Sequence, residues 1–242
     1  MENVIEITGL KKSFGDNQVL KNVNLTVKKG ENVVVLGKSG QGKSVTIKCL
    51  VGLIEPDAGV LNVLGKDIQE ANRDEIKELR TRIGFLFQGG ALYDSMTVRE
   101  NLEFPLTRVL RLKDKEKIRQ LCEEVLEAVG LSEAIDKMPS ELSGGMRKRM
   151  ALARTLVVKP EIILYDEPTT GLDTITSKEI SRLILEVQKK YQTSSIIITH
   201  DIPCAQITAD RILIMNDGEY IAEGTFEELS NSEDEFIRSF FK

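Results

Sequence analysis

A glycine-rich turn, GKSGQGKS at 37–44, follows directly on the apolar run NVVVL and precedes a helical pattern. This is the G-x-x-x-x-G-K-[ST] pattern of a phosphate-binding loop, in the strand–loop–helix order that such a loop requires. Its glycines let successive backbone N–H groups point at a phosphate, and the helix N-terminus adds a favourable dipole. Lys43 is expected to contact the β- and γ-phosphates, and the Ser44 hydroxyl to bind Mg²⁺. The residues expected to contact a nucleoside triphosphate are Gly37, Lys38, Ser39, Gly40, Gln41, Gly42, Lys43, Ser44 and Val45.

A pair of acidic residues ends another apolar run, in EIILYDEP at 161–168. Asp166 stands at a strand end, where its carboxylate can hold Mg²⁺, and Glu167 can polarise a water for attack on a phosphate. Adjacent side chains leave a strand on opposite sides, so one is expected to face the metal and the other the water. Acidic pairs are common in loops, and it is the phosphate-binding loop that favours the catalytic interpretation.

The single histidine, His200, follows the apolar run SIIIT and precedes Asp201. A lone histidine is most often a surface or core residue. This one ends a strand in a sheet whose other strand ends carry phosphate- and metal-binding groups, and an imidazole can donate to a γ-phosphate or to the attacking water. We therefore predict that His200 is a catalytic residue.

A second helix start suited to binding an anion lies in ELSGGMRKRM at 141–150. Ser140 and Ser143 can both cap the helix that begins near Gly144. Gly144 and Gly145 carry no side chain, so the backbone and the Ser143 hydroxyl can approach an oxyanion. A simple capped helix would use the same residues. Within one molecule a second such turn is redundant, whereas it completes the site if it reaches the nucleotide of another copy.

Composition limits the class of protein. The 242 residues are 41% hydrophobic and 29% charged, as in ordinary globular proteins. The net charge of −5 argues against a nucleic-acid partner, and the basic run 147–149 is most simply a solvated helix face. Three scattered cysteines indicate neither a disulfide framework nor structural zinc. We expect no signal peptide, and no apolar run approaches the ~20 residues that span a bilayer.

Short β-branched runs alternate with helical patterns, which indicates an α/β fold. Runs that alternate apolar and polar residues predict antiparallel strands at 3–8, 19–27 and 58–65. Continuous apolar runs predict strands buried on both faces at 32–36, 83–87, 161–165, 195–199 and 211–215, the last turning at Asp217-Gly218 into 219–224. Helices are expected at 43–53, 73–81, 114–129, 144–157, 176–190 and near 202–209. The pattern from 89 to 157 is almost entirely helical, which predicts an inserted helical subdomain.

These motifs, taken together, resemble those of the ATP-binding cassette (ABC) ATPases over nearly the whole chain. GKSGQGKS is similar to the family's Walker A loop, IILYDEP to its Walker B strand, LSGGM to its signature motif and TTGLD to its D-loop. His200 is similar to the switch histidine. Gln88 in FLFQGG is similar to the Q-loop glutamine, a catalytic and metal-binding residue, and Phe14 in KKSFG to the aromatic residue that stacks on adenine.

The resemblance implies a single domain, 1–242, with a RecA-like parallel-sheet core. It assigns an antiparallel β subdomain and the first part of the core to 1–88, a helical subdomain to 89–157, and the rest of the core with a C-terminal helix to 158–242. It further implies a head-to-tail dimer that encloses two ATP molecules and Mg²⁺. The residues that would complete the nucleotide site from the second copy are Leu142, Ser143, Gly144 and Gly145, with Asp173 in the D-loop.

Longer stretches, such as FLFQGGALYDSMTVRENLEFPL and MPSELSGGMRKRMALARTL, are similar to the Mla-type (MCE-system) phospholipid transport ATPases. This similarity implies ATP hydrolysis that energises phospholipid transport between membranes. It implies an inner-membrane permease, an MCE-domain lipid-binding protein and a small STAS-domain regulator as partners, with the chain peripheral on the cytoplasmic face of that membrane. Another cargo (an amino acid, a metal or a drug) and a cell-division-type regulator are the alternatives.

Departures from the family pattern are few. Val45 stands where a second hydroxyl residue is common, Met146 where glutamine is common, and Thr174 where proline is frequent. None alters the catalytic candidates, so we expect a competent ATPase. The apolar residues between 92 and 106 are interpreted either as core of the helical subdomain or as a groove for a permease helix.

Overall fold

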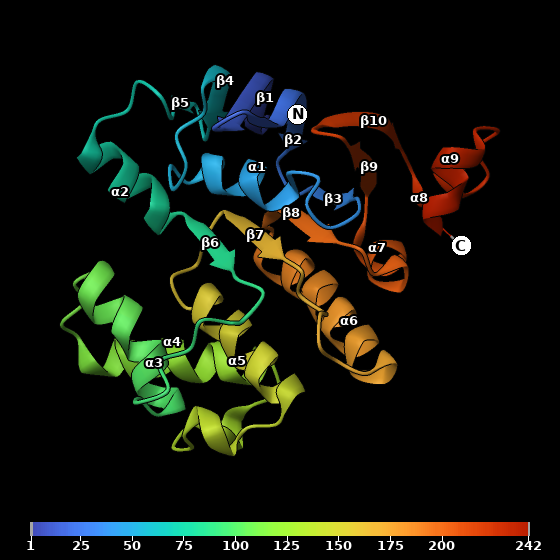
Figure 1. Cartoon of the computed structure of the whole chain (residues 1–242). Helices are drawn as coiled ribbons and strands as arrows, with labels where there is room; N and C mark the ends of the chain where they lie inside the picture. The colour runs from blue at the N-terminus through green and yellow to red at the C-terminus, as the bar shows by residue number, and fades with distance from the viewer. Residues whose placement is uncertain (1, 242) are drawn as a thin grey trace.

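The five strands predicted to be buried on both faces, together with the hairpin strand predicted at 219–224, form one six-stranded sheet in the computed structural model, which describes residues 2–241. Its order is β10-β9-β3-β8-β7-β6 (Figure 1). The members are β3 (Asn32–Leu36), β6 (Ile83–Leu86), β7 (Ile162–Asp166), β8 (Ser194–Thr199), β9 (Arg211–Asn216) and β10 (Glu219–Gly224). Neighbours pair in parallel, except in the β9–β10 hairpin. The predicted parallel core is confirmed, and the carboxyl ends of β3, β7 and β8 meet at one edge.

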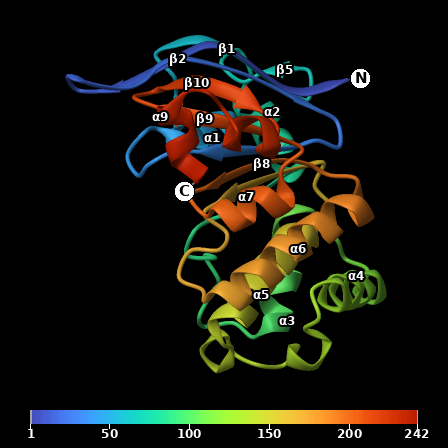
Figure 2. The same cartoon turned by 90° about the vertical axis from the view of Figure 1, so that its right-hand side faces the viewer.

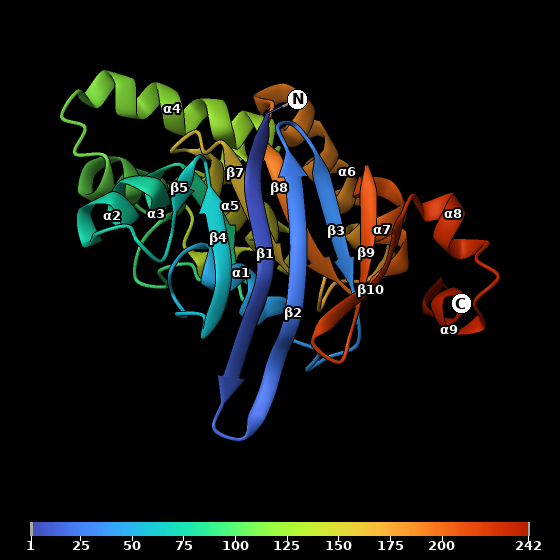
Figure 3. The same ribbon diagram turned by 90° about the horizontal axis from the view of Figure 1, so that it is seen from above.

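The predicted antiparallel strands form a separate four-stranded sheet of order β2-β1-β4-β5. Its members are β1 (Asn3–Phe14), β2 (Asn17–Lys28), β4 (Ala58–Val63) and β5 (Lys66–Asp67). The long β1–β2 hairpin, seen from above in Figure 3, carries both strands beyond the predicted ranges. The two-residue β5 was not predicted, because so short a segment has no readable alternation.

Two hydrophobic cores lie on opposite faces of the six-stranded sheet. Along β3, Val33 and Val35 pack with the antiparallel sheet and with α1 (Lys43–Leu50), whereas Val34 and Leu36 pack with the other core. This is the alternation of a strand that is buried on both faces. Figure 2 shows the two layers on either side of the sheet, with the antiparallel strands on one side and the long helices on the other.

The helices of the second layer are α5 (Gly144–Leu156), α6 (Thr174–Tyr191) and α7 (Ile202–Thr208). They correspond to predicted helices and differ from them by no more than two residues at each end, as expected where an end is set by its cap. Where one C-terminal helix was expected, two short helices follow β10, namely α8 (Phe226–Ser230) and α9 (Glu235–Arg238). Of the helices described between residues 2 and 241, none combines the length and apolarity needed to cross a bilayer.

Helix α2 (Arg73–Thr81) matches its predicted range. The reason is local, because Asn72 and Glu75 form a reciprocal capping box at its start. The Asn72 side chain accepts from the Asp74 and Glu75 backbone N–H groups at 3.0 and 3.1 Å, and Glu75 accepts from the Asn72 N–H at 2.9 Å.

The segment 89–157 is less helical than predicted. It holds α3 (Val98–Phe104), a π-helical turn (Pro105–Val109), α4 (Lys115–Ala128) and α5, joined by irregular backbone and short 3₁₀ turns. The buried Asn101 side chain explains the irregular part before α3. Its amide donates to the carbonyls of Tyr93 and Met96 at 3.1 and 3.0 Å and accepts from the Tyr93 N–H at 2.9 Å. One tertiary side chain therefore replaces the helical hydrogen bonds that the pattern suggested.

Candidate nucleotide-binding site

The glycine-rich turn connects β3 to α1, as predicted. Gly42 caps α1 with φ 102°, and a Cβ on it would lie 2.7 Å from the Leu20 side chain and 2.8 Å from the Val19 carbonyl. Only glycine fits this position without a shift of the neighbouring strand. The turn therefore leaves the N-terminal N–H groups of an eight-residue helix without a side-chain cap, free to bind an anion.

Lys43 lies beneath this turn with 6% of its surface exposed. Its ammonium donates to the carbonyl of Gly37 at 2.5 Å and to that of Lys38 at 3.0 Å. Burial lowers the pKa of Lys43, while the Glu167 and Asp166 carboxylates act in the opposite direction. The lysine thus holds the turn together and brings a partly desolvated cation to the place where phosphates would lie.

Ser44 and Asp166 meet across the edge of the sheet. The Ser44 Oγ donates to the Asp166 Oδ1 at 2.8 Å, although the residues are 122 positions apart. Asp166 is the last residue of β7 and is buried. Residues 2–241 hold no group of three His, Cys, Asp or Glu side chains able to bind a metal. A hydroxyl and one carboxylate fit Mg²⁺, which keeps several waters and is completed by substrate phosphates.

Glu167 lies just beyond the end of β7, in a left-handed conformation with φ 52°. The expectation that strand alternation separates it from Asp166 is therefore wrong, because this turn directs the side chain instead. Its backbone N–H donates to the Ile198 carbonyl at 2.9 Å. Its Oε2 is 2.8 Å from the His200 Nδ1, and its Oε1 is 4.0 Å from the Lys43 Nζ. The carboxylate is thus held between an imidazole and an ammonium group.

These groups line one cavity of about 250 Å³. Predicted site residues supply most of its wall: Ser39, Gly40, Gln41, Gly42, Lys43, Ser44, Val45, Gln88, Asp166, Glu167 and His200. Gly37 and Lys38 line a neighbouring cavity that His200 also borders. Val19 on β2 was missed as a lining residue, because nothing in its local pattern indicates that the second sheet reaches the turn.

The remaining predicted residues lie outside this cavity. Phe14, at the tip of the β1–β2 hairpin, has 49% of its surface exposed. Leu142 is buried, and Ser143 caps α5 by accepting from the Met146 N–H at 3.3 Å. Asp173 caps α6. The signature turn and the phosphate-binding turn are therefore not joined within one chain.

Near the signature turn, Gly144 borders a different cavity of about 460 Å³, together with 89–92 and 170–172. Gly145 packs so closely on α6 that a Cβ would lie 2.7 Å from the Thr176 side chain. The prediction that 147–149 is a solvated face is wrong for Lys148. Its side chain is partly buried and donates to the Gln88 carbonyl at 2.5 Å.

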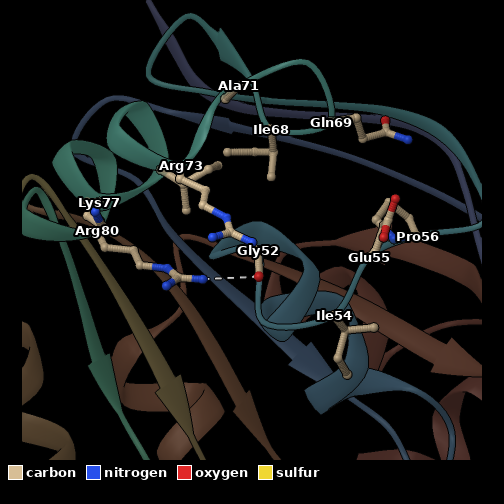
Figure 4. Close-up of a pocket in the computed structure, with 11 residues that line it drawn as sticks. Gly52, Ile54, Glu55, Pro56, Ile68, Gln69, Ala71, Arg73, Lys77 and Arg80 are labelled. Atoms are coloured by element: carbon tan, nitrogen blue, oxygen red, sulfur yellow. Dashed lines mark hydrogen bonds between the residues drawn. The ribbon is translucent and has the colours of Figure 1, made fainter.

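A larger cavity of about 530 Å³ lies between the end of α1 and α2 (Figure 4). Arg73, Lys77 and Arg80 line it beside aliphatic side chains. The Arg80 guanidinium donates to the carbonyls of Val51 and Gly52 at 2.8 and 3.0 Å, so it braces the end of α1. No predicted nucleotide-site residue borders this cavity. We therefore take the smaller cavity as the candidate nucleotide site, because the predicted phosphate-binding and catalytic side chains line it.

Residues 20–170 match the protein family described as "ABC transporter". The chain belongs to the ABC transporter family. A dimeric structure of the ATP-binding cassette MJ0796 in a post-hydrolysis state, bound to ADP and Pi, is similar to it with a TM-score of 0.82 and 33% identity, over 92% of this chain and 98% of that one. The fold and the family together identify the chain as an ABC ATPase.

Two curated relatives extend the comparison. The Haemophilus influenzae "Intermembrane phospholipid transport system ATP-binding protein MlaF" is 39% identical over 241 residues, covering 100% of this chain and 91% of that protein. The Mycobacterium tuberculosis "Probable ribonucleotide transport ATP-binding protein mkl" is 42% identical over 236 residues, covering 98% of this chain and 66% of that protein. The names of these two ABC proteins point to different cargoes.

Proposed function

We propose that this chain is the ATP-hydrolysing subunit of an ABC transporter that moves phospholipid between membranes. The observation that carries the catalytic part is the cavity in which Lys43, Ser44, Asp166, Glu167 and His200 converge on the phosphate-binding turn. The full-length similarity to a phospholipid transport protein supports the cargo.

In this proposal, the turn 37–45 holds the triphosphate, and Lys43 neutralises the charge of its β- and γ-phosphates. Ser44, Asp166 and Gln88 would hold Mg²⁺, which supplies charge neutralisation and orientation of the phosphates when bound. Phe14 is assigned to the adenine ring because it resembles the family's adenine-stacking aromatic residue. Its half-exposed ring leaves a face available for stacking.

Glu167 is assigned as the base that accepts a proton from the attacking water. The water oxygen bonds to the γ-phosphorus, the bond to the β–γ bridging oxygen breaks, and ADP and phosphate are released. His200 contacts the Glu167 carboxylate through its Nδ1. Its Nε2 would then contact the γ-phosphate or the attacking water. The Lys43 ammonium, 4.0 Å from the Glu167 Oε1, places a positive charge beside this carboxylate.

A second copy of the chain is proposed to complete each site. Leu142, Ser143, Gly144 and Gly145 lie outside the phosphate-binding cavity of their own chain, and Asp173 caps the helix that packs on them. A serine-capped, glycine-lined helix start is suited to the far side of a triphosphate. The dimeric MJ0796 cassette supports this arrangement. The three segments 1–88, 89–157 and 158–242 would then act as one ABC ATPase domain.

A permease is proposed to dock in an apolar groove beside α3. The groove, about 480 Å³, lies between β6 and the π-helical turn, and Phe87, Tyr93 and Val109 expose 38%, 42% and 51% of their surfaces there. Val98 and Leu106, two of the apolar residues between 92 and 106, are buried in the core. Tyr93 of the same segment lines the groove instead. An exposed apolar groove of this kind suits one amphipathic helix.

Replacing Val109 with glutamate should weaken recovery of the permease from detergent-solubilised membranes by at least about tenfold, because a charge would be buried unpaired in the interface. ATP hydrolysis by the isolated chain should stay within about twofold of the wild type, since Val109 lies outside the nucleotide cavity. Val60→Glu is the matched control, because Val60 is similarly exposed, at 46%, on the antiparallel sheet. Equal recovery with both variants would exclude the groove as the docking site.

Further partners follow from the phospholipid assignment, namely an MCE-domain lipid-binding protein and a STAS-domain regulator, with the chain peripheral on the cytoplasmic face of the inner membrane. The alternative is another cargo, which the ribonucleotide transport name of the mycobacterial relative supports. Purification of the tagged chain with its permease and identification of the bound molecules tests the cargo. Phospholipid and an MCE protein in the complex are expected, and their absence from an intact complex would favour the alternative.

A further inference from the structure

Lys148 links the signature helix to the turn that carries Gln88. It lies on α5, one helical turn after Gly144, and its ammonium donates to the Gln88 backbone carbonyl at 2.5 Å. The Lys148 side chain is partly buried, whereas the Gln88 end of the bond is exposed. Because the donor is an ammonium, the hydrogen bond is charge-assisted, and such bonds are stronger than neutral ones.

The turn at 87–90 rests on the same face of α5 at further points. A Cβ added to Gly90, which has φ 73°, would lie 3.2 Å from the Ala151 Cβ, and the Arg154 Nη2 donates to the Gly90 carbonyl at 3.4 Å. Residues 148, 151 and 154 share one helix face because they recur at a spacing of three. Of these three contacts, only that of Lys148 reaches the backbone of Gln88 itself.

Lys148 also lies in the electrostatic field of the catalytic carboxylates. Burial lowers the pKa of its ammonium, while Glu167 and Asp166 act in the opposite direction. The same pair of carboxylates acts on Lys43. Lys148 therefore joins the signature helix to the Gln88 turn by a hydrogen bond, and it interacts electrostatically with the carboxylates at the end of β7.

We propose that Lys148 is a positioning residue that sets the place of Gln88 relative to Asp166 and Glu167 through its hydrogen bond to the Gln88 carbonyl. Any displacement of α5 against the sheet is passed to Gln88 through this bond, so the start of the signature helix and the catalytic carboxylates are mechanically coupled. Without the ammonium, the Gln88 carbonyl loses this donor and the turn loses this attachment to α5. This inference rests on the proposed ATPase function and names a further residue that supports it.

The test uses the full chain with Lys148→Met, Lys148→Arg and, as control, Arg147→Met. Arg147 is the exposed neighbour on the same helix. Lys148→Met should lower kcat about tenfold, as expected for the loss of one charge-assisted hydrogen bond, and leave KM for ATP within about twofold. Lys148→Arg should recover most of kcat, because it keeps the charge and the donor. Without nucleotide, hydrogen exchange at 87–90 should increase in Lys148→Met alone.

Equal kcat values for Lys148→Met and Arg147→Met would overturn the inference. So would a loss in Lys148→Met that Lys148→Arg does not recover, or unchanged exchange at 87–90. If the wild-type chain hydrolyses ATP and Glu167→Gln does not, these results concern Lys148 alone. If Glu167→Gln hydrolyses ATP like the wild type, the assignment of the catalytic site fails first, and the inference fails with it.

Discussion

Replacing Glu167 with glutamine is expected to lower steady-state ATP hydrolysis by at least about a hundredfold, the range seen when a general base is removed. Glutamine keeps the size of the side chain and can still bond His200, now 2.8 Å from the Glu167 Oε2, but it cannot accept the proton of the attacking water. ATP binding should persist, because the phosphate contacts come from 37–45. Phosphate release and nucleotide binding, measured on the same preparation, check both parts.

Glu186→Gln provides the control for this substitution, since Glu186 is an exposed acidic residue on α6. Its hydrolysis rate should equal that of the wild type. Wild-type turnover by Glu167→Gln would remove Glu167 from its assigned role, whatever the behaviour of the control.

Replacing Lys43 with methionine is expected to reduce the affinity for ATP by at least about a hundredfold. The variant keeps the volume of the side chain but loses the cation that faces the phosphates. It also leaves the Gly37 and Lys38 carbonyls, at 2.5 and 3.0 Å from the ammonium, without their donor. The two losses act on the same turn, so hydrolysis should fall with binding. Titration of a fluorescent ATP analogue measures the affinity.

The matched control is Lys48→Met, on the same helix and partly buried, but outside the cavity. It should bind ATP within about twofold of the wild type. If Lys43→Met bound ATP as tightly as Lys48→Met, the glycine-rich turn would not be the nucleotide site.

Local sequence patterns were sufficient to predict which residues line the candidate nucleotide site. The apolar runs that end at Asp166 and before His200 are strands of one parallel sheet, so their carboxyl ends had to meet beside the turn 37–44. The 2.8 Å contacts of Ser44 with Asp166 and of His200 with Glu167 follow from that topology. The period of an apolar pattern can be read directly from a sequence.

What could not be predicted depends on single tertiary contacts. The irregular backbone before α3 is organised by the buried amide of Asn101, which the periodicity of 89–157 concealed. The left-handed turn at Glu167 overrides the alternation expected of a strand. Lys148 belongs to a basic run typical of a solvated face, and only the packing of α5 against the Gln88 turn gives it a partner.

The two helix starts that are suited to binding an anion show the same contrast between local pattern and tertiary arrangement. Each can be predicted from its serine, glycines and flanking pattern, yet one chain leaves them in separate cavities. Because the two turns lie in separate cavities, we propose that a second copy supplies the signature turn to each nucleotide site.

The most direct test is the mass of Glu167→Gln in solution with saturating Mg-ATP, measured by light scattering. We expect twice the mass of one chain with ATP, and the mass of a single chain without it. Adding Gly144→Trp to the same variant should return the mass to that of one chain while ATP stays bound, because Gly144 is exposed, lies outside the cavity of its own chain, and an added Cβ there would meet its own chain only at 3.6 Å, on the Leu172 side chain. If the ATP-saturated Glu167→Gln variant remained a single chain, also with its permease present, that result would contradict the proposal that two copies enclose the nucleotide.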